Sequence, residues 1–314
     1  MMMKVVFFGT PQFAAHTLSY LLNNHVNIVS VVTRTDKPKG RSKQPLPPPV
    51  KIAALEHSPP LPVLQPEKAS NDEFVHELKQ RRADLFVVVA YGEILRQQVL
   101  DIPSLGCINV HASLLPKYRG AAPIQRCIIN GETTTGVTIM HMVRKMDAGP
   151  IIKTAATSIG PNETFGQLEE KLCKMGSQLL LEVIKDFEKD SVDEIPQDEA
   201  QATYAPKIEL EECRIDWHQP AEAIHRLVRG VTPYPGAWCH VLVRGEKKML
   251  KMKASHVVKD MSGKPAQILS CDRSGLLIAC GDGALRVSKL QLEGKREMEP
   301  SDFLRGTPVE CILP

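Results

Sequence analysis

The chain has 314 residues, of which 43% are hydrophobic and 24% are charged, and its formal net charge is only +3. This length and apolar content exclude a disordered chain and favour two domains, one with a substantial core and one with a smaller core. The net charge is too small to indicate a nucleic-acid partner by itself, although the basic excess lies in the last third of the sequence.

The eight cysteines are scattered singly, without a Cys-x-x-Cys pair or the dense spacing of small secreted domains. We therefore expect reduced thiols, and we expect no metal because structural zinc needs closely spaced cysteine and histidine ligands. The apolar run at the amino terminus is too short for a signal peptide or a membrane span. This predicts a cytoplasmic protein that does not enter a membrane.

Four apolar segments before residue 112 have the character of buried strands, with helical stretches between them: Lys4–Phe8, Val26–Val32, Asp84–Ala90 and Gly106–His111. Such alternation predicts a Rossmann-like α/β domain with a mostly parallel sheet covered on both faces. The first strand ends at Gly9-Thr10-Pro11, which lacks the Gly-x-Gly-x-x-Gly loop that a dinucleotide needs. A Rossmann dehydrogenase is therefore disfavoured.

A basic loop at residues 34–49 follows the second strand, with Asp36 as its only acidic residue and three prolines at its exit. The loop has two interpretations. It is either a solvated connection without a partner or a loop that contacts phosphates.

An apolar stripe at helical spacing predicts a packing helix over Glu163–Glu188, and the polar, proline-punctuated residues 191–208 suit a linker between domains. We therefore place a first domain at residues 1–190 and a second at 209–314. The second contains a short helix at Ala221–Arg229 and a series of short apolar runs, which predict a small barrel or sandwich. These runs are Ala237–Val243, Met249–Ala254, Ala266–Ser270, Gly275–Cys280 and Ala284–Leu292.

Asn109 and His111 lie at the carboxyl end of the fourth strand, where open α/β sheets bind ligands. Their side chains point to the same side because side chains alternate along a strand. An amide can stabilise oxygen charge in a tetrahedral intermediate, and a histidine can move a proton near neutral pH, so the pair suits acyl transfer. Asp147, just before a glycine turn, is a candidate to orient His111 and to accept a proton. Taken separately, the pair also fits a histidine that caps a loop, and Asp-x-Gly fits a simple turn.

Five motifs occur in an order and spacing that resembles the methionyl-tRNA formyltransferase family, within the folate-dependent formyltransferases. They are Phe8–Pro11, Val88–Leu95, HASLLPKYRGAAPIQ at 111–125, Gly136–Met140 and MDAGPI at 146–151. The resemblance runs from Val5 to nearly the end of the chain. It implies a formyltransferase domain followed by a small barrel that resembles an OB-fold.

The resemblance assigns the family's catalytic residues to Asn109, His111 and Asp147, the same three that the residue pattern indicates. It further implies 10-formyltetrahydrofolate as the formyl donor, with no metal. The implied folate-binding residues are Ala90, Tyr91, Gly92, Glu93, Ile94, Leu95, Ser113, Leu114, Leu115, Pro116 and Val143.

The resemblance also implies that initiator methionyl-tRNA is the formyl acceptor and that the protein is a monomer. The basic loop is expected to reach the acceptor stem, and the barrel is expected to contact the tRNA backbone. The implied tRNA-binding residues are Arg41, Lys43, Arg226, Arg229, Arg244, Lys247, Lys248 and Lys251, and Lys253 adds to the basic character of the barrel's first half.

Three alternatives remain open at this point. The chain could act on an amino sugar or a purine precursor, it could be a hydrolase that releases formate from the folate, or it could be a nucleotide- or RNA-binding module without catalysis. The basic loop, the basic barrel and the Gly120–Gln125 continuation favour tRNA as the substrate. The three intact polar residues favour an enzyme.

Overall fold

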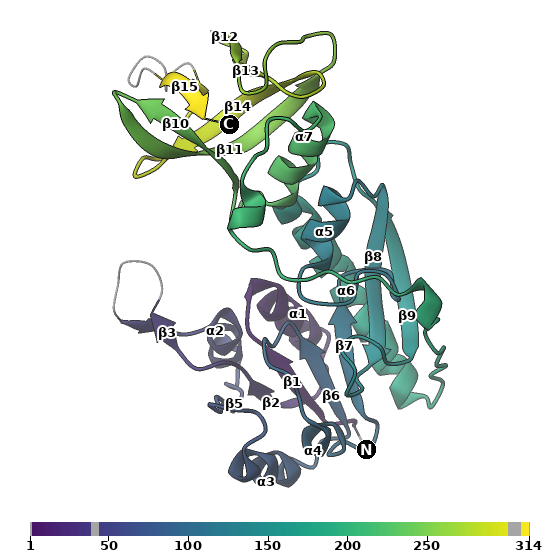
Figure 1. Ribbon diagram of the computed structural model, residues 1–314. Coiled ribbons are helices and arrows are strands. Elements are labelled where there is room, and N and C mark those ends of the chain that lie inside the picture. Colours follow the sequence, from purple (N-terminus) through teal and green to yellow (C-terminus); the bar gives the residue numbers. More distant parts are fainter. Residues whose placement is uncertain (1, 39–43, 301–308, 314) are drawn as a thin grey trace. The chain divides into compact units, whose positions relative to one another are not determined.

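The computed structural model describes residues 2–38, 44–300 and 309–313 (Figure 1). The chain forms two compact units. The first comprises residues 1–120, 136–157 and 169–204, and the second comprises 121–135, 158–168 and 205–314. The second unit thus includes two short segments that lie before the linker predicted at 191–208.

The first unit contains a seven-stranded sheet of order β5-β2-β1-β6-β7-β8-β9. Within the run β5-β2-β1-β6-β7 each pair of adjacent strands is parallel, and β8 is antiparallel to β7. This confirms the predicted mostly parallel sheet. The bounds are β1 (Val5–Gly9), β2 (Ile28–Val32), β5 (Val63–Leu64), β6 (Leu85–Val89), β7 (Cys107–His111), β8 (Thr134–His141) and β9 (Ile151–Ser158).

The helices start where local sequence favours them. The α1 helix follows Pro11, α2 has a proline at its first position, and the side chain of Asn71 accepts a hydrogen bond from the backbone N–H of Glu73 at the start of α3. The long helix α6 begins at Phe165, two residues after the predicted start at Glu163. The bounds are α1 (Gln12–Asn23), α2 (Pro49–Glu56), α3 (Asp72–Gln80), α4 (Gln97–Leu100) and α6 (Phe165–Glu188).

The predicted basic loop has a short antiparallel pair at its base, formed by β3 (Lys37–Pro38) and β4 (Pro45–Leu46). The pair fixes where the loop leaves and re-enters the first unit. Residues 39–43, which include the predicted tRNA contacts Arg41 and Lys43, lie outside the described residues.

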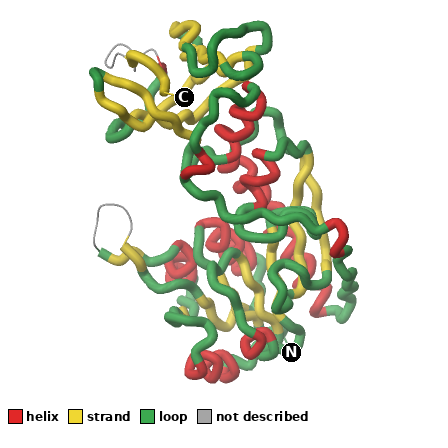
Figure 2. Tube along the Cα trace, viewed as in Figure 1, coloured by secondary structure: helices red, strands yellow, loops and turns green. Residues whose placement is uncertain are grey.

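The second unit has a six-stranded antiparallel sheet of order β12-β13-β14-β11-β10-β15, whose curl makes it a half-barrel (Figure 2). This agrees with the expected small barrel. β11 is longer than the predicted run, and β15 was not predicted. The bounds are β10 (Ala237–Val243), β11 (Glu246–Val258), β12 (Ile268–Asp272), β13 (Gly275–Ala279), β14 (Ala284–Leu292) and β15 (Val309–Leu313).

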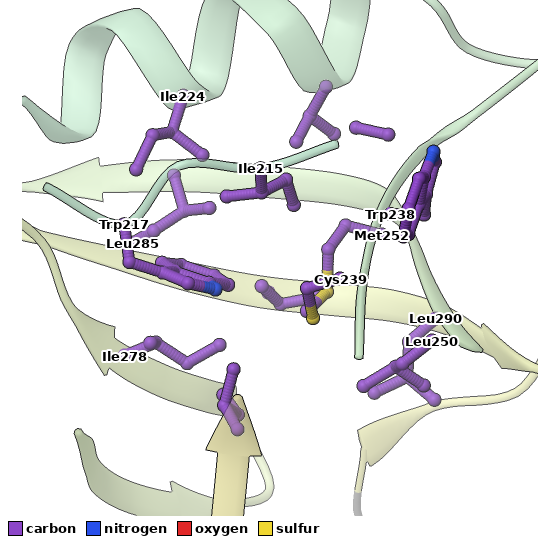
Figure 3. Close-up of a cluster of buried hydrophobic side chains, with 14 of the residues drawn as sticks. Ile215, Trp217, Ile224, Trp238, Cys239, Leu250, Met252, Ile278, Leu285 and Leu290 are labelled. Carbon is purple, nitrogen blue, oxygen red and sulfur yellow. The ribbon is translucent and has the colours of Figure 1, made fainter. Parts of the chain in front are cut away.

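Two helices, α5 (Pro123–Ile129) and α7 (Ala221–Gly230), belong to the second unit. Ile224 of α7 packs into a core with the two tryptophans, Trp217 and Trp238, and with side chains from the sheet (Figure 3). The indole N–H of Trp238 donates to the carbonyl of Leu210 at 2.9 Å, so its polar atom is satisfied. Short 3-10 helices at Glu199–Gln201 and Glu211–Cys213 interrupt the segment before α7.

All eight cysteines are free, as the sequence predicts. Burial raises the pKa of Cys107 and that of Cys239 to about 12, so neither is a reactive thiolate at neutral pH. No helix in the described part of the chain is long and apolar enough to cross a membrane.

Candidate active site

The end of β7 places Asn109 and His111 on the same side of the strand. Asn109 lies between Val88 of β6 and Met140 of β8, and His111 lies opposite Thr138 of β8. Only 5% of His111 is exposed, whereas Asn109 is half-buried. Within the described residues the Asn109 amide has no hydrogen-bond partner, so it is available to a ligand.

Both ring nitrogens of His111 face oxygen atoms. Nε2 lies 2.9 Å from the backbone carbonyl of Tyr118, which can only accept, so Nε2 carries a hydrogen. Nδ1 lies 3.7 Å from Oδ2 of Asp147. In the neutral ring Nδ1 is then the nitrogen with a lone pair, and it is the atom at which a proton can be taken up or released beside the carboxylate.

Asp147 is held in place by its backbone and by its side chain. Its φ of 50° lies in the left-handed region, which is uncommon for a residue with a side chain. Its Oδ2 accepts a hydrogen bond from the backbone N–H of Gly120 at 2.8 Å. Gly149 closes the turn, where a Cβ would lie 1.8 Å from the carbonyl oxygen of His141. The turn therefore requires glycine at 149 and directs the carboxylate toward His111.

A single amide, that of Gln197, holds this turn against the segment that follows β7. Its Nε2 donates to the carbonyl oxygens of Asp147 at 2.9 Å and Gly149 at 2.7 Å. Its Oε1 accepts from Nε of Arg119 at 3.0 Å and from Nη2 at 2.7 Å. Arg119 is 1% exposed and also pairs with Glu199 at 3.0 Å. These bonds fix residues 118–120, which supply the partners of His111 and Asp147.

The segment after His111 turns inward around Thr138. The Thr138 hydroxyl donates to the carbonyl of Ser113 at 2.7 Å and accepts from the N–H of Leu115 at 3.1 Å. Ser113 and Leu115 are buried, while Leu114 and Pro116 are half-buried. Two of the four predicted folate-binding residues here thus pack against the protein itself.

The loop after β6 shows a similar division. Tyr91 and Leu95 are buried in a core cluster, and burial together with the charge of Glu93 raises the pKa of Tyr91 to about 12. Ala90 and Gly92 are exposed with φ values of 46° and 86°, and Ile94 is 71% exposed. Exposed backbone and an exposed apolar side chain at this strand end can offer both polar and apolar contacts to a ligand.

Two further contacts hold this loop and its surroundings. Glu93 forms an ion pair with Arg34 and accepts a hydrogen bond from the N–H of Ala69 at 2.9 Å. Val143, the remaining predicted folate-binding residue, is 43% exposed, and the neighbouring Met142 packs against the cluster that contains Tyr91 and Leu95. The loop is thus held by the polar contacts of Glu93 and by the apolar packing of Tyr91 and Leu95.

Comparison with known proteins bears on both parts of the chain. Residues 3–184 match the family model described as formyl transferase, and residues 207–308 match that of the formyl transferase C-terminal domain. A protein of Protochlamydia amoebophila (strain UWE25) named methionyl-tRNA formyltransferase is 54% identical over 304 residues, which cover 97% of this chain and 95% of that protein. The chain belongs to the methionyl-tRNA formyltransferase family.

Solved structures support the fold of this family at lower identity. The sugar 3N-formyltransferase WlaRD, crystallised with dTDP and 5-N-formyl-THF, has a TM-score of 0.68 at 19% identity over 94% of this chain and 100% of that chain. HypX from Aquifex aeolicus in complex with tetrahydrofolic acid has a TM-score of 0.68 at 18% identity. The match covers 97% of this chain and 47% of HypX, so the chain spans about half the length of that protein.

The tRNA-binding residues predicted from the family resemblance differ in their surroundings. Arg244 and Lys247 are exposed near the β10–β11 turn, whereas Lys248 is paired with Glu246 at 2.9 Å and Lys251 donates to the carbonyl of Pro235 at 2.8 Å. Lys253 likewise donates to the carbonyl of Pro233 at 2.8 Å. Arg226 is half-buried, and Arg229 is 7% exposed.

Sequence reasoning missed several residues that hold the site, namely Tyr118, Arg119, Thr138 and Gln197. Arg119 and Tyr118 lie inside the 111–125 motif, so the motif's length was a usable signal. Thr138 could have been found from its pairing with His111 once β8 was taken as antiparallel. Gln197 lies in the predicted linker, and no pattern there marks it.

Proposed function

We propose that the protein transfers the formyl group of 10-formyltetrahydrofolate to the amino group of methionyl-initiator tRNA, giving N-formylmethionyl-tRNA for translation initiation. The observation that carries the proposal is the group of three side chains at the end of β7. There an unpartnered Asn109 amide, a buried His111 and the Asp147 carboxylate lie together. High identity to a protein named for this activity supports the choice of acceptor.

Each of the three side chains has a role in the proposed reaction. The Asn109 amide donates a hydrogen bond to the formyl oxygen, which gains negative charge when the methionyl amine attacks the carbon. His111 holds or moves a proton at Nδ1, and Asp147 orients the ring and stabilises positive charge on it. As the bond between the formyl carbon and N10 of the folate breaks, N10 takes up a proton in exchange for the one that the attacking amine loses, and tetrahydrofolate leaves. The folate supplies the formyl group. Because the amine itself is the nucleophile, no covalent enzyme intermediate is required.

The residues that would hold the folate are the exposed part of the Ala90–Leu95 loop, the half-buried Leu114 and Pro116, and Val143. The positive-φ backbone and exposed apolar surface of this loop fit a pterin ring. In this proposal the buried Tyr91, Leu95, Ser113 and Leu115 shape the pocket from behind.

We propose that tRNA contacts come from the basic loop, with Arg41 and Lys43, and from the C-terminal unit, with Arg226, Arg229, Arg244, Lys247, Lys248 and Lys251. The division into a catalytic domain at 1–190, a linker at 191–208 and a tRNA-binding domain at 209–314 is part of the same proposal. So are a monomeric state and a cytoplasmic location. Contacts to phosphate predict that tRNA binding weakens steeply as salt rises.

The decisive experiment measures transfer of labelled formyl from 10-formyltetrahydrofolate to charged initiator tRNA. An elongator methionyl-tRNA, free methionine and an acceptor-free reaction serve as controls. Transfer to the initiator alone supports the proposal. Formate release without an acceptor would point to a hydrolase, and transfer to an amino sugar but not to tRNA would point to a sugar formyltransferase.

A further inference from the structure

A pocket of about 550 Å³ lies within the second unit. The three proposed catalytic residues belong to the first unit and do not line this pocket. It is formed by α7, by the turn at 131–133 after α5, by residues 159–162 and by β11. Four of its lining residues are basic or can become so: His225, Arg226, Arg229 and His256.

The two arginines are three residues apart on α7 and therefore share one face of the helix. Nη1 of Arg229 donates to the carbonyl oxygens of Gly160 at 3.4 Å and Glu163 at 3.2 Å. The Nε atoms of Arg226 and Arg229 are both buried without a hydrogen-bond partner. In the part of the chain that the structure describes, neither guanidinium forms an ion pair with a carboxylate.

Two adjacent positive charges that lack a carboxylate partner are unfavourable in a partly desolvated place. The effect is visible in Arg229, which is 7% exposed and whose pKa is lowered by burial and by the charge of Arg226. Of the carboxylates that line the pocket, Glu222 is paired with Lys259 at 3.1 Å. The charge of Glu163 acts on the pKa of Arg229 in the opposite direction, and its contribution is smaller than those of burial and of Arg226.

His225 contributes structure rather than charge. Its Nδ1 lies 3.0 Å from the hydroxyl of Ser255, and its Nε2 lies 3.1 Å from Oδ1 of Asn162 and 3.3 Å from the carbonyl of Pro161. Burial lowers the pKa of His225, so the ring is neutral at pH 7 and holds the walls of the pocket together. The exposed ring of His256 lines the same pocket, 6.5 Å away between ring centroids.

We propose that this pocket binds one phosphate group through the guanidinium groups of Arg226 and Arg229. Phosphate fits because its tetrahedral oxygens accept the paired N–H groups of guanidinium forks and its charge offsets the two arginines. The volume leaves room for a substituent on the phosphate. Backbone phosphates of tRNA and free phosphorylated small molecules share this chemistry. The inference deepens the tRNA contacts proposed above for Arg226 and Arg229 and rests on that proposal for its tRNA arm. It does not depend on the proposed catalytic residues, so a failure of phosphate binding and a failure of formyl transfer are separate results.

The test is thermal unfolding of the full chain during titration with inorganic phosphate, with potassium chloride adjusted to keep the ionic strength constant. A ligand that binds the folded chain raises Tm with concentration. We expect phosphate to raise Tm beyond the chloride control. Arg226→Ala should weaken phosphate binding about tenfold or more, because charge-assisted hydrogen bonds are lost. Arg273→Ala, at an exposed arginine of the same unit outside the pocket, should bind phosphate as the wild type does.

Arg229 is buried, so Arg229→Lys, which keeps the charge but loses the fork, is a better second variant than alanine; it should also weaken phosphate binding. Repeating the titration with initiator tRNA present distinguishes the sources. If tRNA abolishes the phosphate effect, the pocket takes a backbone phosphate; if the effect persists, it takes a free phosphorylated molecule. The proposal is overturned if phosphate stabilises no more than chloride, or if Arg226→Ala binds phosphate as tightly as the wild type.

Discussion

The proposed active site of the first unit, at Asn109, His111 and Asp147, and the pocket of the second unit each bury a histidine near charged groups, but the partners of the two histidines differ. His111 lies between a carbonyl and the carboxylate of Asp147, and the nearby Asn109 amide is open. His225 is held by a hydroxyl, a carbonyl and an amide oxygen, with two arginines beside it. The first arrangement can move a proton next to a negative charge, whereas the second excludes a proton and leaves positive charge for an anion. The partners of a buried histidine, more than its burial, indicate its role.

Replacing His111 should give the largest effect on activity. His111→Ala removes the proton-moving group, and we expect kcat for formyl transfer to fall about a thousandfold while the chain remains folded. Steady-state kinetics and circular dichroism measure the two quantities. Ser177→Ala is the control, because it removes a buried hydroxyl of the same unit that bonds Thr17 outside the site. The kcat of Ser177→Ala should equal that of the wild type. If Ser177→Ala lowered kcat as much as His111→Ala does, the activity would be sensitive to the removal of any buried polar group in this unit.

Asp147→Asn separates charge from shape. The amide oxygen of asparagine can still accept from Gly120, so the turn is kept while the negative charge beside His111 is lost. We expect kcat to fall about a hundredfold with little change in Tm. Kinetics at saturating substrates with a parallel melting curve provide the measurement. A normal rate would show that Asp147 only forms a turn.

Gln197→Ala tests the link between the Asp147 turn and Arg119. It removes two donated hydrogen bonds and the acceptor of Arg119, so we expect about 1–3 kcal/mol lower stability and about a tenfold lower kcat. Gln201→Ala is the matched control, because Gln201 is exposed in the same segment and bonds only Asp198. Denaturant unfolding measures the stability and steady-state kinetics measure kcat. Equal stability and equal kcat in the two variants would contradict the prediction.

The smallest effect concerns pH and the second histidine. Burial lowers the pKa of His225 below its ordinary value of 6.5, so the unfolded chain takes up this proton at a higher pH than the folded chain. Stability from this group is therefore present above pH 6.5 and is lost as pH falls below it. The variant His225→Gln cannot take up this proton, so its stability does not fall with pH for this reason. The amount by which the Tm of the wild type exceeds that of the variant should therefore shrink as pH falls from about 8 to about 5. A constant difference would argue against the buried neutral ring.

The elements that sequence predicted best are those with strong periodic patterns. The strands β1, β6 and β7 are mostly apolar runs, and α6 has a long apolar stripe. The apolar pattern of the sequence was therefore enough to predict these elements. The alternation of side chains along β7 was enough to put Asn109 and His111 on one side of the strand. The residue pattern offered Asp147 as a candidate partner for His111, and the family resemblance assigned it, because a turn before glycine has many uses when taken alone.

What could not be predicted depends on contacts between distant residues. Gln197 bonds Asp147 and Arg119, which are 50 and 78 positions away, and its own segment has no periodic pattern. The second unit incorporates residues 121–135 and 158–168, which a linear division of the chain cannot anticipate. The length of β11 was underestimated because its register shifts near Ala254 and breaks the simple alternation.

The most direct test of the catalytic account is the single-turnover rate of formyl transfer to initiator tRNA by Asn109→Ala. Asn109 is half-buried and has no hydrogen-bond partner in the described protein, so its truncation should leave the fold intact. We predict a rate about a hundredfold to a thousandfold below wild type, with an unchanged melting temperature. A wild-type rate from the folded variant would contradict the claim that this strand end is the active site.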